Sequence, residues 1–351
     1  MITKLRLKNF TAFDELEIEF SPGINILIGE NGTGKTHLMK AAYVLCSPGD
    51  PDIGVNPDVF LMNKLRRVFK PYENFLVEMH RHGSGNTSSI QAEIHEGSNN
   101  GNTNISFTSL TKQMNQNSMS DYFNPTTHPV FIPAKEVLSF MIGFVALYEK
   151  YNLEFDETYK DICQILSLPT ARIEKLTETD SWAMEKIEKV CGGKFIIEAF
   201  RVIFQAKDNT IYGVNMVAEG FRKLGMLSRL IENKSIEPGI SGPLFWDEPE
   251  SNMNPTVMRL MVDILLKLSR NGQQIILATH DYVLLKWFDL LMAKDKNNQV
   301  RFHSLYRDSA SGSIKVTSVD SYQQLTDTSI AATFSALYDN EIDRAFAGEK
   351  R

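Results

Sequence analysis

The sequence predicts an α/β protein, and three observations carry that prediction. An apolar segment at residues 24–28 runs into a glycine-rich turn and then into a helix with apolar residues at helical spacing. Further apolar segments at 244–246 and 275–278 alternate with helical patterns at 224–231 and 257–268. Such alternation is typical of a largely parallel sheet, whose functional loops lie at the carboxyl ends of its strands.

The size and charge of the chain narrow the classes of protein. Its 351 residues exceed what one hydrophobic core usually serves, so we expect a large domain with an insertion, or two lobes. An apolar fraction of 42% and a charged fraction of 23% are typical of globular proteins. The net charge of -6 argues against a protein that holds nucleic acid mainly by bulk charge.

The cysteines and the amino-terminal segment bear on the compartment. Cys46, Cys163 and Cys191 are far apart in sequence and odd in number, which argues against a disulfide framework and a cysteine zinc site. The first ten residues lack the apolar core of a secretory signal, and no window approaches 18 consecutive apolar residues. We therefore expect a soluble cytoplasmic protein that does not enter a membrane.

Periodicity and turn residues divide the chain into four expected parts. These are an amino-terminal unit of strands and the glycine-rich turn at 1–47, a β-rich insertion at 48–128, a helical lobe at 129–192, and the rest of the main sheet at 193–351.

Within these parts the expected elements follow the same patterns. Two edge-type strands precede the buried strand at 24–28, and a hairpin turn is expected at 98–102. The expected strands are 2–7, 16–20, 75–80, 89–95, 104–110, 130–132, 195–204, 300–306 and 314–316; the expected helices include 137–145, two or more across 155–190, and one at the carboxyl end.

The glycine-rich turn matches the pattern G-x-x-x-x-G-K-[ST] between a strand and a helix, the context that this phosphate-binding motif requires. Its backbone N–H groups and the helix amino end can surround phosphates, while Lys35 reaches the outer phosphates and Thr36 can ligate Mg²⁺. The sequence thus predicts ATP and Mg²⁺ as ligands. The expected contacts are Gly29, Asn31, Gly32, Thr33, Gly34, Lys35, Thr36 and His37.

Two acidic residues follow the apolar strand at 244–246. We expect Asp247 to lie beside the metal and Glu248 to polarise the attacking water, because phosphoanhydride hydrolysis needs both roles. His280 follows the strand at 275–278, where an imidazole can donate a hydrogen bond to the terminal phosphate. Lys35, Glu248 and His280 are therefore the expected catalytic residues.

Together these motifs resemble the ATPase heads of the ABC superfamily, in particular the RecF, SMC and OLD-like branch. The resemblance covers roughly residues 1–45 and 210–285, including the opening strands. It implies an ABC-type P-loop head with a mostly parallel sheet, in which residues 247–250 form the Walker B motif. It further implies that residues 251–255 are the D-loop and that His280 is the switch histidine.

The resemblance also implies a signature loop that caps the ATP of a second subunit. The candidate is 217–224, in which Ala218, Glu219 and Gly220 replace the family's L-S-G-G pattern. Gly220 permits close backbone approach, and Arg222 or Lys223 could supply positive charge. No glutamine matches the family's Q-loop, and the role of residues 134–136 stays open.

Three weaker signals have ordinary interpretations. His80, His82 and His95 lack the spacing of a metal site and are expected at the surface. A basic cluster on a predicted helix is expected to be a solvated face, and an apolar stripe on the terminal helix is expected to pack on its own domain, with docking of a partner as the alternative. The cluster comprises Lys64, Arg66, Arg67 and Lys70, and the stripe Ile330, Phe334, Leu337, Tyr338 and Ile342.

These observations favour an ATP-hydrolysing switch that forms a homodimer or higher oligomer around ATP. Because the chain lacks long heptad arms and a nuclease constellation, its effector would be a separate protein, such as a nuclease. Resemblance to Septu-like and other OLD-like systems implies a role in anti-phage defence. The alternatives are a RecF-like DNA repair ATPase that binds DNA itself and, third, the ATPase subunit of a membrane transporter.

Overall fold

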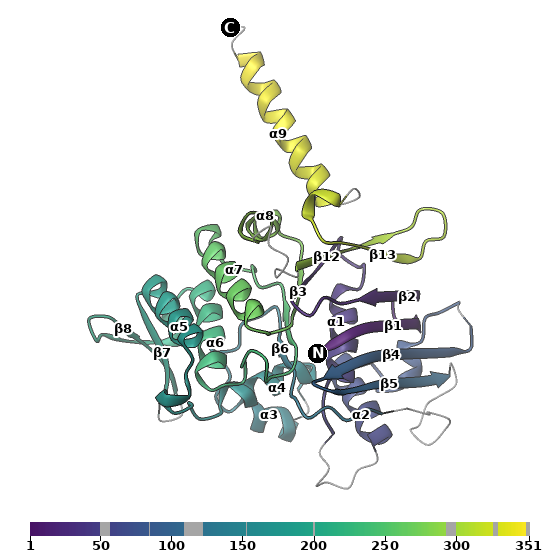
Figure 1. The fold of residues 1–351 in the computed structure, drawn as a ribbon, viewed down its shortest axis with the longest axis horizontal. Helices are drawn as coiled ribbons and strands as arrows, with labels where there is room; N and C mark the ends of the chain where they lie inside the picture. The colour runs from purple at the N-terminus through teal and green to yellow at the C-terminus, as the bar shows by residue number, and fades with distance from the viewer. Residues whose placement is uncertain are drawn as a thin grey trace.

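In the computed structural model, two sheets and two groups of helices are arranged around a central six-stranded sheet (Figure 1). The structure describes residues 1–49, 57–83, 85–108, 122–151, 153–198, 201–292, 300–325 and 329–348.

The central sheet is parallel except at one edge. Its order is β13-β12-β3-β11-β10-β6, and β13 alone among these strands runs antiparallel to its neighbour. This confirms the predicted mostly parallel sheet and places the carboxyl ends of β3, β10 and β11 at the same edge. The strands are β3 (Ile24–Gly29), β6 (Val130–Ile132), β10 (Leu244–Asp247), β11 (Ile275–Thr279), β12 (Val300–Arg307) and β13 (Ile314–Val319).

The two faces of this sheet belong to two hydrophobic cores. Ile24, Ile26 and Ile28 of β3 face one core, whereas Leu27 faces the other, as the two-residue period of a strand dictates. Because both faces are covered, the central strands are continuously apolar. On one side pack α4 (Glu157–Leu166), α5 (Glu178–Cys191), α6 (Glu219–Glu232), α7 (Pro255–Arg270) and α8 (Tyr282–Leu291).

The other core contains α1 (Lys35–Leu45) and α2 (Pro57–Phe69) and is closed by an antiparallel sheet of order β2-β1-β4-β5 (Figure 1). Its strands are β1 (Ile2–Phe10), β2 (Phe13–Glu19), β4 (Thr87–Glu96) and β5 (Asn99–Thr108). The prediction that both amino-terminal strands lie at edges is wrong for β1, which pairs with β2 and β4. Its alternating pattern reports one buried face, and such a pattern does not distinguish edge from interior strands.

Two predicted elements differ in the structure. Residues 76–79 form a 3₁₀ helix, η2 (Leu76–Met79), and not a strand, because the Glu78 carboxylate accepts hydrogen bonds from the N–H groups of Glu73 and Phe75. The helix expected from residue 137 begins only at Phe144, as α3 (Phe144–Tyr151). Val137, Leu138 and Met141 before it are buried in irregular segments and turns, so their spacing resembled that of a helix without forming one.

The remaining elements are short. A three-stranded sheet comprises β7 (Gly193–Glu198), β8 (Arg201–Ala206) and β9 (Ile211–Gly213), in agreement with the strands expected across 195–204. The other 3₁₀ helices are η3 (Ile173–Lys175), η4 (Val214–Met216) and η5 (Tyr322–Gln324). The hairpin β4-β5 turns at 97–98, just before the expected 98–102.

The basic cluster on α2 is not a solvated face. Lys64 is buried, and its ammonium lies 2.5 Å from the Asp161 carboxylate of α4. Arg67 pairs with Glu157 at 2.8 Å. The acidic face of α4 therefore fixes α2, a partner that sequence spacing could not reveal. Expected surface exposure is also wrong for His80, which is buried with its Nδ1 2.8 Å from the Ser88 hydroxyl.

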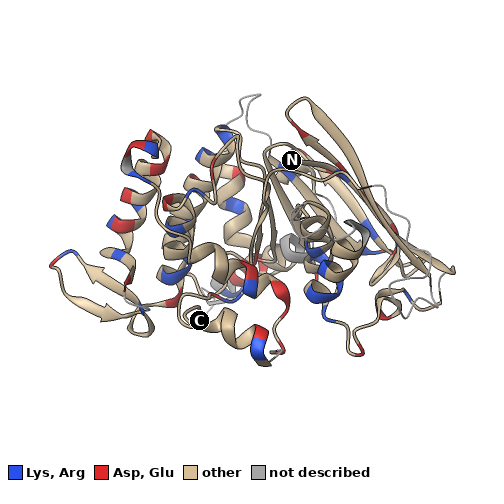
Figure 2. Ribbon diagram, turned by 90° about the horizontal axis from the view of Figure 1, so that it is seen from below, with Lys and Arg blue, Asp and Glu red and all other residues tan. Residues whose placement is uncertain are grey.

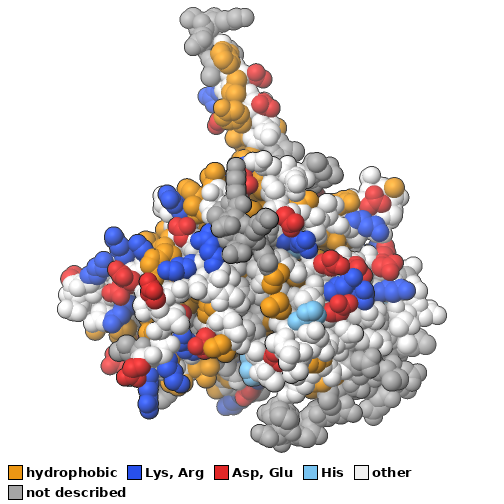
Figure 3. Space-filling view, viewed as in Figure 1, with side chains coloured by type: hydrophobic (Ala, Val, Ile, Leu, Met, Phe, Trp, Pro, Cys, Tyr) orange, Lys and Arg blue, Asp and Glu red, His pale blue; other side chains and the backbone are white. Residues whose placement is uncertain are grey.

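The terminal helix α9 (Ser329–Gly348) extends away from the body (Figure 1). Phe334 stacks on Tyr282 with ring centroids 4.2 Å apart, but Leu337 and Tyr338 remain more than half exposed. Apolar side chains line the projecting helix in Figure 3. The expectation that this stripe packs on its own domain is wrong for Leu337 and Tyr338, because within the described residues the helix projects away from the body there.

The three cysteines are free and buried, and burial raises the pKa of each thiol to about 12.

Of the helices within the described residues, none combines the length and the apolar character needed to cross a membrane.

A buried histidine generates a test of the fold. Burial lowers the pKa of His303 from 6.5 to about 3, and its ring contacts the hydroxyl of Ser318 and the amide of Asn25. Below pH 6.5 the unfolded chain binds a proton that the folded chain excludes, so the free energy of unfolding falls as the pH falls toward 3. His303→Gln should make this decline shallower in melting-temperature scans. The exposed control His95→Gln should leave the slope unchanged, and equal slopes for both variants would contradict the assignment.

Candidate active site

The glycine-rich loop joins β3 to α1 and has a backbone that only glycine adopts readily. Gly34 has φ 87°, and a Cβ atom there would lie 2.6 Å from the ring of Phe13. The hydroxyl of Thr33 donates to the Glu30 carbonyl at 2.8 Å and closes the turn. The loop therefore ends directly at the amino end of α1, where unpaired N–H groups and the helix dipole favour anions.

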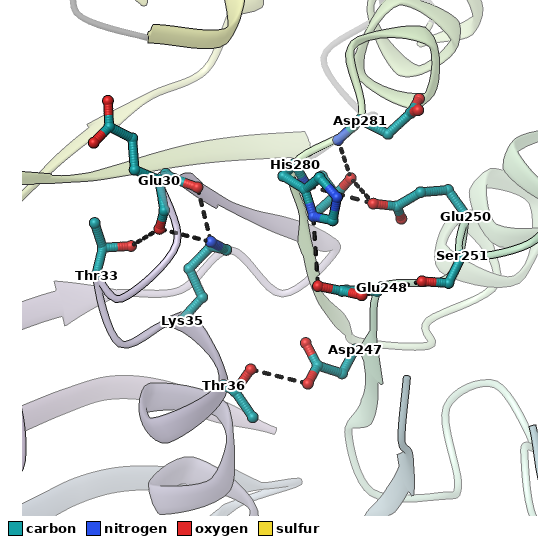
Figure 4. A network of polar contacts seen from close by, with 12 residues as sticks. Glu30, Thr33, Lys35, Thr36, Asp247, Glu248, Glu250, Ser251, His280 and Asp281 are labelled. Atoms are coloured by element: carbon teal, nitrogen blue, oxygen red, sulfur yellow. Dashed lines mark hydrogen bonds and ion pairs between the residues drawn. The ribbon is translucent and has the colours of Figure 1, made fainter. Parts of the chain in front are cut away.

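Lys35 points back over this loop (Figure 4). Its ammonium donates to the carbonyls of Gly29 and Glu30 at 2.7 and 3.1 Å. Burial lowers its pKa, while the charge of Asp247 acts in the opposite direction. A positive charge is thus held inside the concavity of the loop.

Thr36 and Asp247 meet across 211 residues of sequence. The Thr36 hydroxyl donates to Oδ2 of Asp247 at 2.9 Å, so the first turn of α1 touches the end of β10 (Figure 4). Burial raises the pKa of the Asp247 carboxyl, and the Thr36 hydrogen bond lowers it. A hydroxyl beside a carboxylate is the oxygen donor set that Mg²⁺ uses together with nucleotide phosphates.

Glu248 is held at its backbone and at both carboxylate oxygens. Its φ of 44° lies in the left-handed region, and its N–H donates to the Ala278 carbonyl at 2.9 Å. The Ser251 hydroxyl donates to Oε2 at 3.0 Å, and Nδ1 of His280 lies 3.4 Å from Oε1. The structure thereby brings together Glu248 and His280, two of the three expected catalytic residues, beside Asp247.

Glu250 supports the turn that carries His280. Its Oε1 accepts a hydrogen bond from the Thr279 hydroxyl at 2.7 Å and one from the His280 N–H at 3.4 Å. Burial raises the pKa of the Glu250 carboxyl, and the Thr279 bond opposes that shift. The side chain of His280 remains half exposed, so it can reach a ligand.

Lys35, Thr36, Asp247 and Glu248 line a cavity of about 250 Å³, whereas His280 and Glu250 lie outside its described lining. His37 lines it too, with its ring 5.4 Å from that of Phe69, and burial lowers the pKa of His37 to about 4. Its imidazole is therefore neutral at physiological pH and offers no cation to a phosphate. The described lining comprises Ala12, Asn31, Gly32, Gly34, Lys35, Thr36, His37, Asp247 and Glu248.

The candidate signature residues lie elsewhere. Ala218, Glu219 and Gly220 begin α6 and do not line this cavity. A Cβ atom on Gly220 would lie 3.1 Å from Asn252, whose side chain donates to Glu219 at 2.9 Å. The start of α6 thus packs against the segment that follows β10.

Neither basic residue proposed to supply charge from this loop is directed outward. Arg222 pairs with the buried Glu136 at 2.8 Å, which gives a partner to the one acid in the segment 134–136. Lys223 is 1% exposed and donates to the Glu248 carbonyl at 3.0 Å. The expectation of positive charge there is wrong, because acceptors inside the chain engage both cations.

Sequence reasoning missed three contacts at the site. Ala12 follows the amino-terminal strand and lines the cavity, and no motif marks it. Ser251 fell within the expected D-loop, but its bond to the Glu248 carboxylate was not foreseen. The burial of Lys223 had a signal in the apolar spacing of α6, because Leu227 and Leu230 follow it by four and seven residues on the same helix face.

Comparisons with family models match two segments on either side of the middle of the chain. One AAA-domain model matches residues 4–126. A second AAA-domain model, whose description names AbiEii toxin and Type IV TA system, matches residues 207–286.

Curated relatives match over a short segment. The DNA replication and repair protein RecF of Oceanobacillus iheyensis is 57% identical over 44 residues, and that of Chlamydia abortus is 54% identical over 44 residues. In each case the match covers 12% of this chain and 12% of the relative.

Solved structures match over nearly the whole chain. The SMC head domain from Thermotoga maritima has a TM-score of 0.54 at 13% identity and covers 91% of this chain and 98% of its own. An SMC head bound to the C-winged helix domain of ScpA has a TM-score of 0.59 at 13% identity, with coverage of 93% and 99%. The chain therefore has the fold of the SMC heads, two of its segments match AAA-domain models, and a short segment is similar to RecF.

Proposed function

We propose that this ATPase head binds and hydrolyses ATP, dimerises around it and thereby gates a separate effector protein. The observation that carries the proposal is the meeting of Thr36 with Asp247, beside Glu248 and His280, at the mouth of the phosphate-binding loop (Figure 4). A phosphate-binding loop alone predicts binding. A buried carboxylate and a separate acceptor beside it predict hydrolysis.

Each residue has a distinct chemical task in this proposal. The loop and the amino end of α1 bind the phosphates, and Lys35 exchanges its loop carbonyls for phosphate oxygens. Thr36 and Asp247 would hold Mg²⁺, which would neutralise charge that develops on the phosphates. Glu248 orients the attacking water and accepts its proton, and His280 donates to the terminal phosphate.

Dimerisation would use the candidate signature residues Ala218, Glu219 and Gly220, which do not line the cavity. Ala218 is exposed at the start of α6, where a second copy could present its bound ATP. Two nucleotides shared in this way could supply the differential binding of about 5.5 kcal/mol that moves an equilibrium from 1:99 to 99:1.

The effector and the biological setting rest on three supports. The description of the AAA model that matches residues 207–286 names AbiEii toxin and a Type IV TA system. A similar SMC head was solved with a bound partner, ScpA. The exposed apolar stripe of α9 offers a surface for a protein partner. We infer a role in anti-phage defence with a nuclease or similar effector. We further propose that the chain has four parts, with boundaries after residues 47, 128 and 192.

Direct binding of DNA is the second candidate, and the RecF matches favour it. The charge distribution opposes it. Lysine, arginine and acidic residues are interspersed along the ribbon in Figure 2 and on the face seen in Figure 3. A salt-dependent gel shift with duplex DNA decides between the candidates, since binding through phosphates weakens steeply with salt.

Substitution of the proposed water-orienting residue tests hydrolysis. Glu248→Gln keeps the shape of the side chain but cannot accept a proton, so ATP turnover should fall by a factor on the order of 10² or more while ATP stays bound. Radiolabelled-phosphate release and equilibrium binding of ATP measure the two quantities. Turnover at the wild-type rate would remove Glu248 from its role.

Substitution of the loop lysine tests binding. Lys35→Ala removes the cation from the concavity, so affinity for ATP or turnover should be lost, while the melting temperature without nucleotide stays close to that of the wild type. Lys8→Ala, at an exposed position on β1, is the matched control and should bind ATP normally. Unchanged ATPase rates for Lys35→Ala would contradict the phosphate-loop assignment.

Dimerisation has a separate test. In the Glu248→Gln background, ATP should shift the protein to a dimer in analytical ultracentrifugation. Ala218→Arg should abolish that shift without loss of ATP binding, because a large cation would obstruct the docking surface. The control Ala310→Arg, at another exposed alanine, should still dimerise. A dimer that tolerates Ala218→Arg would exclude this surface.

A further inference from the structure

Lys223 is a buried cation that the proposed reaction does not use directly. It lies at the start of the second turn of α6, is 1% exposed, and donates from its ammonium to the backbone carbonyl of Glu248 at 3.0 Å. Burial lowers the pKa of Lys223, while the charges of Glu250 and Glu219 act in the opposite direction. A buried ammonium requires hydrogen-bond acceptors, and this one directs a donor at the residue proposed to orient water.

The backbone of Glu248 needs such support. A φ of 44° is a strained conformation for a residue with a side chain, and it persists only where the surroundings determine it. The N–H of Glu248 is held by the Ala278 carbonyl of β11, and the Glu248 carbonyl accepts from Lys223 and from the Ser251 N–H at 3.1 Å. Two of these three bonds come from outside the local turn.

The first turn of α6 packs closely on the segment that follows β10. Gly220 approaches Asn252 so tightly that a Cβ atom would lie 3.1 Å from its carbonyl oxygen, and Glu219 accepts from the Asn252 side chain. The base of Lys223 is therefore fixed relative to β10. A rigid base and a single long side chain can set the position of the Glu248 carbonyl, and with it the direction of the carboxylate.

We propose that Lys223 is a positioning residue for ATP hydrolysis, which holds the strained backbone of Glu248 so that its carboxylate faces the attacking water. This inference rests on the proposed role of Glu248. Lys223 is not among the described residues that line the cavity, and its ammonium bonds to Glu248, so we expect it to act through Glu248 and to leave the affinity for ATP unchanged.

The test is a set of variants of the full chain, compared by kcat and by equilibrium binding of Mg-ATP. Lys223→Met keeps an unbranched side chain without a donor. It should lower kcat by a factor on the order of 10², the effect of a misplacement of about 1 Å, with an unchanged dissociation constant for ATP. Lys223→Arg, which retains a cationic donor, should recover part of the lost rate.

A matched control separates positioning from stability. Lys234 also places its ammonium beside a buried carboxylate, 2.6 Å from Asp180, just beyond the other end of α6. Lys234→Met should lower the melting temperature but leave kcat per folded molecule unchanged. Should Lys223→Met fail to fold, Lys223→Gln takes its place, because its shorter amide cannot reach the same carbonyl.

A double-mutant cycle identifies the route of action. In the Glu248→Gln background, measured by single-turnover hydrolysis, Lys223→Met should cause no further loss, since a residue that acts through Glu248 has nothing left to position. A full additional loss in that background would overturn the proposal, as would a wild-type kcat for the folded Lys223 variant. Wild-type turnover by Glu248→Gln alone would instead overturn the proposed function.

Discussion

The candidate site depends on the contact between Thr36 and Asp247. These residues are 211 positions apart, and their hydrogen bond exists only because β3, β11 and β10 are consecutive in a parallel sheet. Parallel strands end at the same edge, so the loop after β3 and the acids after β10 arrive at one place. The rest of the fold, including two cores on either face of the sheet, keeps those strands in register.

The same arrangement concentrates buried charge at that edge. Burial lowers the pKa of Lys35 and raises the pKa values of Asp247 and Glu250, so each of these groups is more easily neutralised than in water. Their proximity opposes this effect, because unlike charges stabilise one another. A nucleotide with its cation adds both signs of charge, which is why such a site suits a ligand that carries its own metal.

Much of this could be predicted from local pattern. Gly34 and Lys35 stand in a motif whose chemistry is local, and apolar runs such as 244–246 and 275–278, each followed by polar residues, favour buried strands. Some predictions that proved wrong depended on distant partners. Lys64 is buried with Asp161 opposite it, whereas Leu337 is exposed on a helix that projects from the described body.

The sequence alone therefore determined the class of fold, the phosphate-binding loop and the acids that follow β10, since each rests on neighbours within a few residues. The tertiary structure decided which of those groups meet. It also decided the strained backbone of Glu248 and its bond from Lys223, because a lysine on a helix carries no mark of the carbonyl it will reach 25 residues later. Local periodicity sets burial and element type, whereas contact between elements is set by how the whole chain packs.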